Sequence, residues 1–177
     1  MKKILFVGDS ITHGTDWESK IDFADVQNIA VPGYSTEDVR AQIGEIFSIN
    51  PKVISLLIGT NDFGNVELDR TGEDVGNRVL SIINLLTTTL KDSQIVVTPI
   101  LPRSSAFTER ILIANRLITS FAHERVIFID SWSALADGDH LKPEYLLMDG
   151  FDGHLSDDGY IAWEMELIPK LREVISI

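Results

Sequence analysis

The sequence predicts an α/β fold in which helices cover both faces of a parallel sheet. Short runs rich in valine and isoleucine, with little polar alternation, recur along the chain, as expected for strands buried on both faces. Longer segments with apolar residues at helical spacing lie between these runs, and such alternation is typical of a parallel sheet with right-handed crossovers. The 177 residues are enough to bury a sizeable core, and we expect residues 1–177 to form a single domain.

Five short apolar runs are expected as strands in a three-layer αβα sandwich. Five strands joined by helices predict the flavodoxin-like arrangement, in which the strand order is 2-1-3-4-5. The carboxyl ends of parallel strands meet at one edge of the sheet, and ligands bind there in folds of this kind. The expected strands are Ile4–Val7, Val26–Ala30, Val53–Ile58, Gln94–Thr98 and Val126–Ile129.

Four amphipathic segments are expected as helices. Ser35, Thr71 and Ser156 are the expected N-caps of three of them, because a hydroxyl can accept a hydrogen bond from the free N–H groups of the first turn. Pro169 lies within the last segment and should kink or divide that helix, since proline has no N–H to donate. We expect residues 131–151 to be irregular and to form a functional loop. The apolar stripes cover residues 39–47, 75–90, 111–121 and 160–174.

The composition excludes several classes of function. The net charge is −12, from 15 basic and 27 acidic residues, and no cluster of lysine or arginine offsets it locally. An acidic surface repels phosphate groups, so we expect neither a nucleic acid nor an anionic membrane as a partner. The chain has no cysteine, which excludes disulfides, thiol catalysis and cysteine-ligated metal sites.

The sequence carries no sign of export, membrane insertion or a bound cofactor. The N-terminal apolar run is about four residues long, shorter than the ~7–15 residues of a signal-peptide core, and no window approaches the ~18 apolar residues of a membrane span. We therefore expect a cytoplasmic protein. His123 and His140 have no partner at metal-ligand spacing, and no glycine-rich nucleotide fingerprint is present, so we expect no metal and no cofactor.

Residues that can carry chemistry follow three of the expected strands and precede the last helix. The first strand ends in Gly8-Asp9-Ser10, the second is followed by Gly33, and the third by Asn61. His154 lies just before the last helix, in a segment that also holds aspartates. Because these segments converge on one edge of the predicted sheet, we expect their side chains to lie together.

These residues are the parts that acyl transfer needs. Ser10 can act as the nucleophile, and His154 can take its proton and return it to the leaving alcohol. The backbone N–H groups of Ser10 and Gly33 and the side-chain amide of Asn61 can stabilise the oxyanion. Each residue taken alone is more often a cap, turn or loop residue, so the prediction depends on finding all of them in one chain.

With these four segments the chain resembles the SGNH (GDSL-like) hydrolases. The resemblance rests on Gly-Asp-Ser at 8–10, an Asn-x-x-x-x-Gly setting at 28–33, Gly-Thr-Asn-Asp at 59–62 and a C-terminal Asp/His pair, in family order across nearly the whole chain. It assigns the family's Ser, Gly, Asn and His to Ser10, Gly33, Asn61 and His154. It implies a flavodoxin-like fold and metal-free hydrolysis of esters through an acyl-serine intermediate.

The acid behind the histidine departs from that pattern. Most family members place an aspartate three residues before the histidine, and this chain has Phe151 there. Asp152 lies two residues before His154, and Asp149 lies five before. We expect Asp152 to support the imidazole, because residues i and i+2 point the same way in extended backbone. Asp149, or a backbone carbonyl acting on a Ser–His dyad, is the alternative.

The predicted function is that of a serine esterase acting on a short-chain, sugar-linked or other small-molecule carboxylic ester. The alternatives are an O-acyltransferase with the same residues and a catalytically silent carbohydrate-binding protein. The oligomeric state is left open. Trp17, Trp132 and Tyr34 are candidates for stacking on a sugar, whereas Asp9 and Asp62 are expected to be structural residues that bond nearby backbone.

Overall fold

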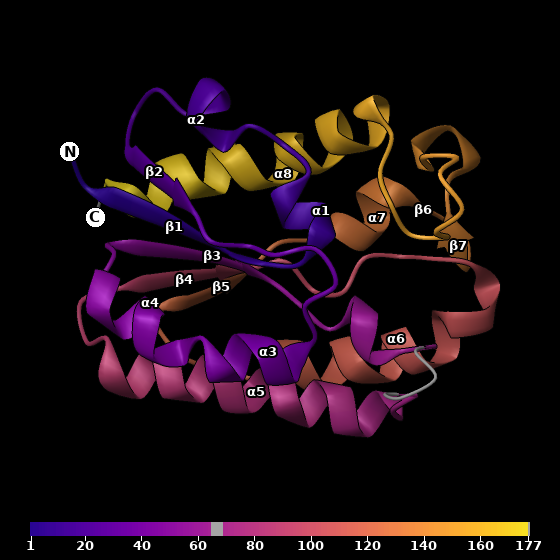
Figure 1. The fold of residues 1–177 in the computed structure, drawn as a ribbon, viewed down its shortest axis with the longest axis horizontal. Coiled ribbons are helices and arrows are strands. Elements are labelled where there is room, and N and C mark those ends of the chain that lie inside the picture. The colour runs from indigo at the N-terminus through magenta and orange to yellow at the C-terminus, as the bar shows by residue number, and fades with distance from the viewer. Residues whose placement is uncertain (65–68, 177) are drawn as a thin grey trace.

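A computed structural model describes residues 1–64 and 69–176. Its centre is a five-stranded parallel sheet in the order β2-β1-β3-β4-β5, which confirms the predicted strand order. Figure 1 shows the strands running in one direction, from the side where both chain ends lie toward the opposite edge. The strands are β1 (Lys3–Gly8), β2 (Asp25–Asn28), β3 (Val53–Leu57), β4 (Gln94–Val97) and β5 (Val126–Phe128).

Helices cover both faces of the sheet, as the three-layer prediction requires (Figure 1). One layer contains α3 (Thr36–Ala41), α4 (Ile43–Ile49), α5 (Gly72–Thr89) and α6 (Ser105–Thr119). The other layer contains α1 (Ser10–His13), α2 (Trp17–Lys20), α7 (Ser131–Leu135) and α8 (Asp157–Ile175).

Strand β1 shows how the two cores arise. Leu5 and Val7 belong to the core under the first helical layer, and Ile4 and Phe6 belong to the core under the second. All four side chains are 0% exposed. Successive side chains of a strand point to opposite faces, so a strand with a core on each side must be apolar at every position.

Trp17 lies in the second core and not at the surface. Its ring stacks on Phe6 with 4.3 Å between ring centroids and meets Trp163 edge-on at 5.3 Å. Its indole N–H donates to the carbonyl of Thr12 at 2.8 Å, which satisfies the one polar atom of the side chain. The prediction that Trp17 stacks on a sugar is therefore wrong, because the ring is 1% exposed.

The three predicted N-caps are confirmed. Ser35 forms a reciprocal capping box with Asp38, Thr71 accepts from the N–H of Asp74, and Ser156 accepts from the N–H of Gly159. The stripe predicted over residues 39–47 is divided between α3 and α4, because ψ of −3° at Gln42 opens the α-helical geometry there.

The segment predicted to be irregular, residues 131–151, contains short regular elements. They are α7, the two-stranded antiparallel pair β6 (Ala136–Asp137) and β7 (His140–Leu141), and the 3-10 helix η2 (Pro143–Tyr145). A second 3-10 helix, η1 (Thr60–Asp62), follows β3. Over residues 1–64 and 69–176, no helix is both long enough and apolar enough to cross a membrane.

Helix α8 continues through Pro169 without the predicted division. Proline leaves the carbonyl four residues earlier, that of Met165, without an intrahelical donor, and Met165 is 71% exposed. The continuous apolar side of α8 contributes Trp163, Leu167 and Leu171 to the second core, which holds the helix together on both sides of the proline.

Replacing Pro169 with alanine should raise the free energy of unfolding by about 1–3 kcal/mol, because the helix gains a donor for Met165. Urea denaturation of both proteins measures the change. Glu166→Ala, at an exposed position of the same helix, is the control and should change stability by less than about 0.5 kcal/mol. Equal free energies of unfolding for Pro169→Ala and wild type would show that Pro169 does not destabilise the helix.

Candidate active site

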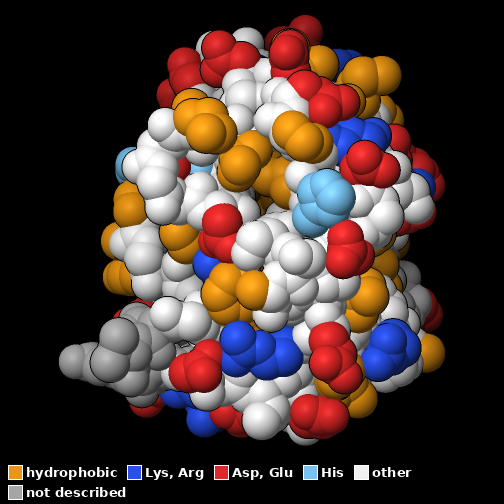
Figure 2. All heavy atoms as spheres, turned by 90° about the vertical axis from the view of Figure 1, so that its right-hand side faces the viewer, with side chains coloured by type: hydrophobic (Ala, Val, Ile, Leu, Met, Phe, Trp, Pro, Cys, Tyr) orange, Lys and Arg blue, Asp and Glu red, His pale blue; other side chains and the backbone are white. Residues whose placement is uncertain are grey.

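The polar residues that follow the strands meet at one edge of the sheet. Ser10 is the first residue of α1, directly after β1, and Asp9 caps that helix by accepting from the N–H of Ile11 at 3.0 Å. Asn61 lies in η1 after β3. Figure 2 looks onto this edge and shows hydrophobic and acidic side chains gathered around a hollow.

Ser10 and His154 are in direct contact. The Oγ of Ser10 and the Nε2 of His154 are 2.9 Å apart, and the other ring nitrogen, Nδ1, is 2.6 Å from Oδ2 of Asp149. With the imidazole proton on Nδ1, the ring donates to Asp149 and accepts from the serine hydroxyl. This arrangement allows His154 to take the proton of Ser10 when the hydroxyl attacks a carbonyl carbon.

The acid at the histidine is Asp149, so the prediction of Asp152 is wrong. Both carboxylate oxygens of Asp152 are engaged elsewhere: Oδ1 accepts from Arg103 at 2.9 and 2.5 Å, and Oδ2 accepts from the hydroxyl of Ser104. Residues 152 and 153 lie in a turn, so the extended backbone assumed for residues 152–154 is not formed. Upstream, Gly150 has a φ of +96°. The Oδ1 of Asp149 also accepts from the N–H of Phe151 at 3.0 Å and folds the loop back toward the imidazole.

The two aspartates ionise easily for different reasons. Hydrogen bonds from His154 and from the N–H of Phe151 hold the pKa of Asp149 below its usual range. Partial burial opposes ionisation of Asp152, but hydrogen bonds from Ser104 and Arg103 outweigh it and lower the pKa of that carboxyl. Both side chains are therefore carboxylates at neutral pH.

Gly33 and Asn61, the other predicted residues, line one cavity of about 490 Å³. Gly33 is exposed, and no atom lies within 4 Å of the place where a Cβ would stand, so the backbone there is open to a ligand. One N–H of the Asn61 amide donates to the carbonyl of Tyr34 at 2.9 Å, and the same nitrogen carries a second N–H that can donate to a ligand. Gly150 and Phe151, from the loop of His154, line the same cavity.

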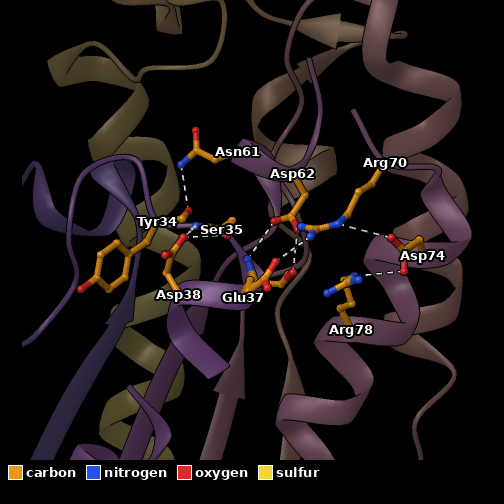
Figure 3. Close-up of polar contacts among 10 residues, drawn as sticks. Tyr34, Ser35, Glu37, Asp38, Asn61, Asp62, Arg70, Asp74 and Arg78 are labelled. Carbon is orange, nitrogen blue, oxygen red and sulfur yellow. Dashed lines mark hydrogen bonds and ion pairs between the residues drawn. The ribbon is translucent and has the colours of Figure 1, made fainter. Parts of the chain in front are cut away.

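A buried network around Asp62 holds these loops in place (Figure 3). The carboxylate of Asp62 is 0% exposed and accepts from the N–H and the hydroxyl of Thr36 at 2.9 and 2.6 Å. Arg70 donates to it at 2.6 Å and also pairs with Glu37. The network joins η1, which carries Asn61, to the start of α3, three residues after Gly33, and this confirms the structural role predicted for Asp62.

The cavity beside Gly33 and Asn61 is lined by aromatic residues other than Tyr34 and Trp132, whose stacking on a sugar stays a prediction. Tyr34 and Trp132 are partly buried and pack against the first core, and Trp132 lines a separate cavity beside Phe128. The side chains that line the cavity beside Gly33 and Asn61 include Arg103 and three phenylalanine rings. The sequence rule that could have found Arg103 is its place in the segment between β4 and α6, which begins at the same sheet edge. The rings are Phe63, Phe107 and Phe151.

Asp9, beside Ser10, is a fully buried carboxyl group. Burial raises its pKa to about 7, although the N–H of Ile11 opposes the shift. Its Oδ1 caps α1, and its Oδ2 has no hydrogen-bond partner in the described part of the chain. The contact with the Ile11 N–H confirms the structural role predicted for Asp9.

The comparisons with known proteins place this arrangement in a family. A model of the GDSL-like Lipase/Acylhydrolase family matches residues 6–162. Platelet-activating factor acetylhydrolase IB subunit alpha1 of Bos taurus is 27% identical over 169 residues, which cover 89% of this chain and 70% of the relative. Subunit alpha2 of Gallus gallus is 32% identical over 106 residues, covering 56% of this chain and 44% of that relative. The chain therefore spans less than half the length of the avian relative.

Solved structures share the fold. A GDSL-like lipase from Bacteroides thetaiotaomicron superposes with a TM-score of 0.80 at 17% identity, covering 97% of this chain and 88% of the other. A catalytic mutant of an acetylxylan esterase from Geobacillus stearothermophilus gives a TM-score of 0.76 at 19% identity, covering 98% and 94%. At such low identity these matches carry the fold and no more.

The contact between Asp149 and His154 predicts that Asp149→Asn lowers kcat for p-nitrophenyl acetate on the order of 10²–10⁴-fold, because an amide cannot stabilise the imidazolium. Asp152→Asn should lower kcat less. Asp139→Asn is the matched control. Asp139 also contacts the Nδ1 of a histidine, at 2.9 Å, but that histidine is His140, which is not the one bonded to Ser10. A larger loss in Asp152→Asn than in Asp149→Asn would return the acid's role to Asp152.

The burial of Asp9 predicts a pH-dependent stability. Its pKa is 3.8 in the unfolded chain and about 7 in the folded one, so the folded state binds more protons between these values and loses stability as the pH rises. Asp9→Asn keeps a cap acceptor but cannot ionise. The variant should gain on wild type by roughly 1.4 kcal/mol for each pH unit within this window, measured by urea denaturation.

The control for that comparison is Asp16→Asn, which alters the exposed N-cap of α2 and should keep a nearly constant offset from wild type. An equally constant offset for Asp9→Asn would mean that Asp9 does not bind an extra proton in the folded state.

Proposed function

The chain belongs to the GDSL-like lipase/acylhydrolase family, and we propose that it is a serine esterase that hydrolyses a small carboxylic ester through an acyl-serine intermediate. The observation that carries the proposal is the continuous hydrogen-bonded line from Ser10 through His154 to Asp149. Such a line activates a hydroxyl that is otherwise a weak nucleophile at neutral pH.

In the first step the Oγ of Ser10 attacks the ester carbonyl carbon, and the Nε2 of His154 accepts the hydroxyl proton. The imidazolium that forms keeps its Nδ1–H bond to Asp149, whose negative charge stabilises it. When the tetrahedral intermediate collapses, His154 gives the proton to the leaving alkoxide oxygen, and the acyl group stays on Ser10.

The oxyanion of that intermediate needs preorganised donors. We assign this role to the backbone N–H groups of Ser10 and Gly33 and to the free N–H of the Asn61 amide. The shared cavity and the Asp62 network, which fixes the Asn61 loop against α3, support the assignment. One donor of this kind typically contributes about 3–4 kcal/mol to transition-state stabilisation.

In the second step water takes the place of the alcohol. His154 accepts a proton from the water, which attacks the acyl carbon, and then returns the proton to Ser10 as the carboxylic acid leaves. An alcohol that enters instead of water would be acylated, so transfer to a hydroxyl acceptor uses the same residues.

A short acyl group, acetyl above all, is the proposed substrate moiety. Two relatives are named for acetyl esters, an acetylhydrolase and an acetylxylan esterase. The cavity beside Gly33 and Asn61 is lined by rings of phenylalanine and by an arginine already neutralised by Asp152, so it favours an uncharged group. A panel of esters tests whether the alcohol part is a sugar.

The test replaces Ser10 with alanine. Without the hydroxyl no acyl-enzyme can form, and kcat for p-nitrophenyl acetate should fall on the order of 10⁴–10⁶-fold while the circular dichroism spectrum stays the same. Ser120→Ala, at the exposed C-cap of α6, is the control and should retain full activity. Labelling by a fluorophosphonate should occur in wild type and be absent in Ser10→Ala.

A panel of p-nitrophenyl and sugar esters of increasing acyl length, run with and without an added alcohol, then defines the substrate. The highest kcat/KM should fall on the acetyl esters. Full activity of Ser10→Ala would overturn the mechanism, and an acylated alcohol as the main product would make the protein an acyltransferase.

A further inference from the structure

Four planar side chains form a row that ends at the imidazole of His154. The guanidinium carbon of Arg103 lies over two rings, 4.0 Å from the centre of Phe107 and 4.5 Å from that of Phe151. The ring of Phe151 in turn meets the ring of His154 with 4.5 Å between centroids, tilted by 43°. Each member of this row is therefore supported by the next.

Arg103 joins the histidine's loop to the loop of Asn61. It is 5% exposed, and its Nε and Nη2 donate to Asp152 at 2.9 and 2.5 Å. Its Nη1 donates at 3.0 Å to the carbonyl of Thr60, the residue directly before Asn61. One rigid guanidinium thus fixes the distance between the two loops on which the proposed base and oxyanion donor stand.

The backbone before His154 is packed tightly against Arg103. A Cβ at Gly153 would lie 2.8 Å from the Cγ of Arg103, closer than real Cβ contacts come, and 3.0 Å from the Cε1 of Phe151, which is tighter than most. The loop therefore has little freedom to move away from the row or toward it. A shift of Arg103 or Phe151 must displace the residue next to His154.

The charges along the row are balanced in a way that suits a base. Asp152 neutralises Arg103, so no uncompensated positive charge stands near an imidazole that must itself become positive. The ring of Phe151 lies between this ion pair and the imidazole and contacts both Arg103 and His154. Phe151 occupies the position where the SGNH pattern has its aspartate, three residues before the histidine.

We propose that Arg103 and Phe151 are positioning residues for His154, with Asp152 as the counter-charge of Arg103. The row holds the imidazole so that Nε2 faces Ser10 while Nδ1 faces Asp149, which lies on an exposed part of the loop. The inference rests on the proposed function, in which His154 is the base.

The test compares Phe151→Leu, which removes the ring, with Phe151→Tyr, which keeps it. Phe151→Leu should lower kcat about 10–100-fold, the effect expected of a misplaced catalytic group, with a smaller change in KM. Phe151→Tyr should restore most of the loss. The low-field proton resonance of the His154 Nδ1–H, present in wild type and Phe151→Tyr, should broaden or disappear in Phe151→Leu.

Arg103→Met and Arg103→Lys extend the test, with Arg125→Met as the matched control. Like Arg103, Arg125 donates to backbone carbonyls, in this case those of Thr87, Leu90 and Ser93. It lies just before β5, at the end of the strand opposite the site. Arg125→Met should lower stability and leave kcat and the Nδ1–H resonance unchanged. Arg103→Met should lower kcat and lose the resonance at a temperature where circular dichroism shows it folded.

The resonance separates this inference from the proposed function, because it needs no substrate. Wild-type kcat and an intact resonance in Phe151→Leu overturn the positioning role, even if Arg103→Met does not fold. A wild type without esterase activity overturns the proposed function, while loss of the resonance in Phe151→Leu would still support the positioning of His154.

Discussion

The constraint on which the structure depends is that both faces of a parallel sheet are buried. Along β1, four consecutive side chains are 0% exposed, divided between two cores, and no polar group can stand there without a partner. Polar chemistry is therefore confined to the places where strands end. Since all five strands run the same way, Ser10, Asn61 and Arg103 come from different strands and still meet at one edge.

Two ion pairs keep that edge in shape. Asp62 of η1 pairs with Arg70, which also pairs with Glu37 of α3, and Arg103 with Asp152 binds the loop after β4 to the loop of His154. Removing Arg70 leaves the charge of the fully buried Asp62 without this cation, and the loss of one partner of a buried pair typically costs about 3–5 kcal/mol. Opening of either loop would break its ion pair, so the pairs restrict the conformations that the loops can adopt.

The sequence predicted the sheet order, the caps and the segments of the site, because periodicity and strand ends are local signals. It favoured Asp152 over Asp149 and was wrong, since the outcome depends on a left-handed Gly150 and on Arg103, which lies 49 residues from the aspartate it holds. Trp17 was misplaced for a similar reason. The residues of α2 do not indicate that Trp17 packs against Phe6 and Trp163, which are distant in the sequence.

The hydrogen bond between Ser10 and His154 joins residues 144 positions apart in the chain. During synthesis the hydroxyl and the centre of the sheet emerge from the ribosome early, and the imidazole emerges only just before α8. A nascent chain thus carries the serine through the synthesis of the next 144 residues without the group that activates it. Chemical competence is acquired only after His154 has emerged, close in time to the helix that closes the second core.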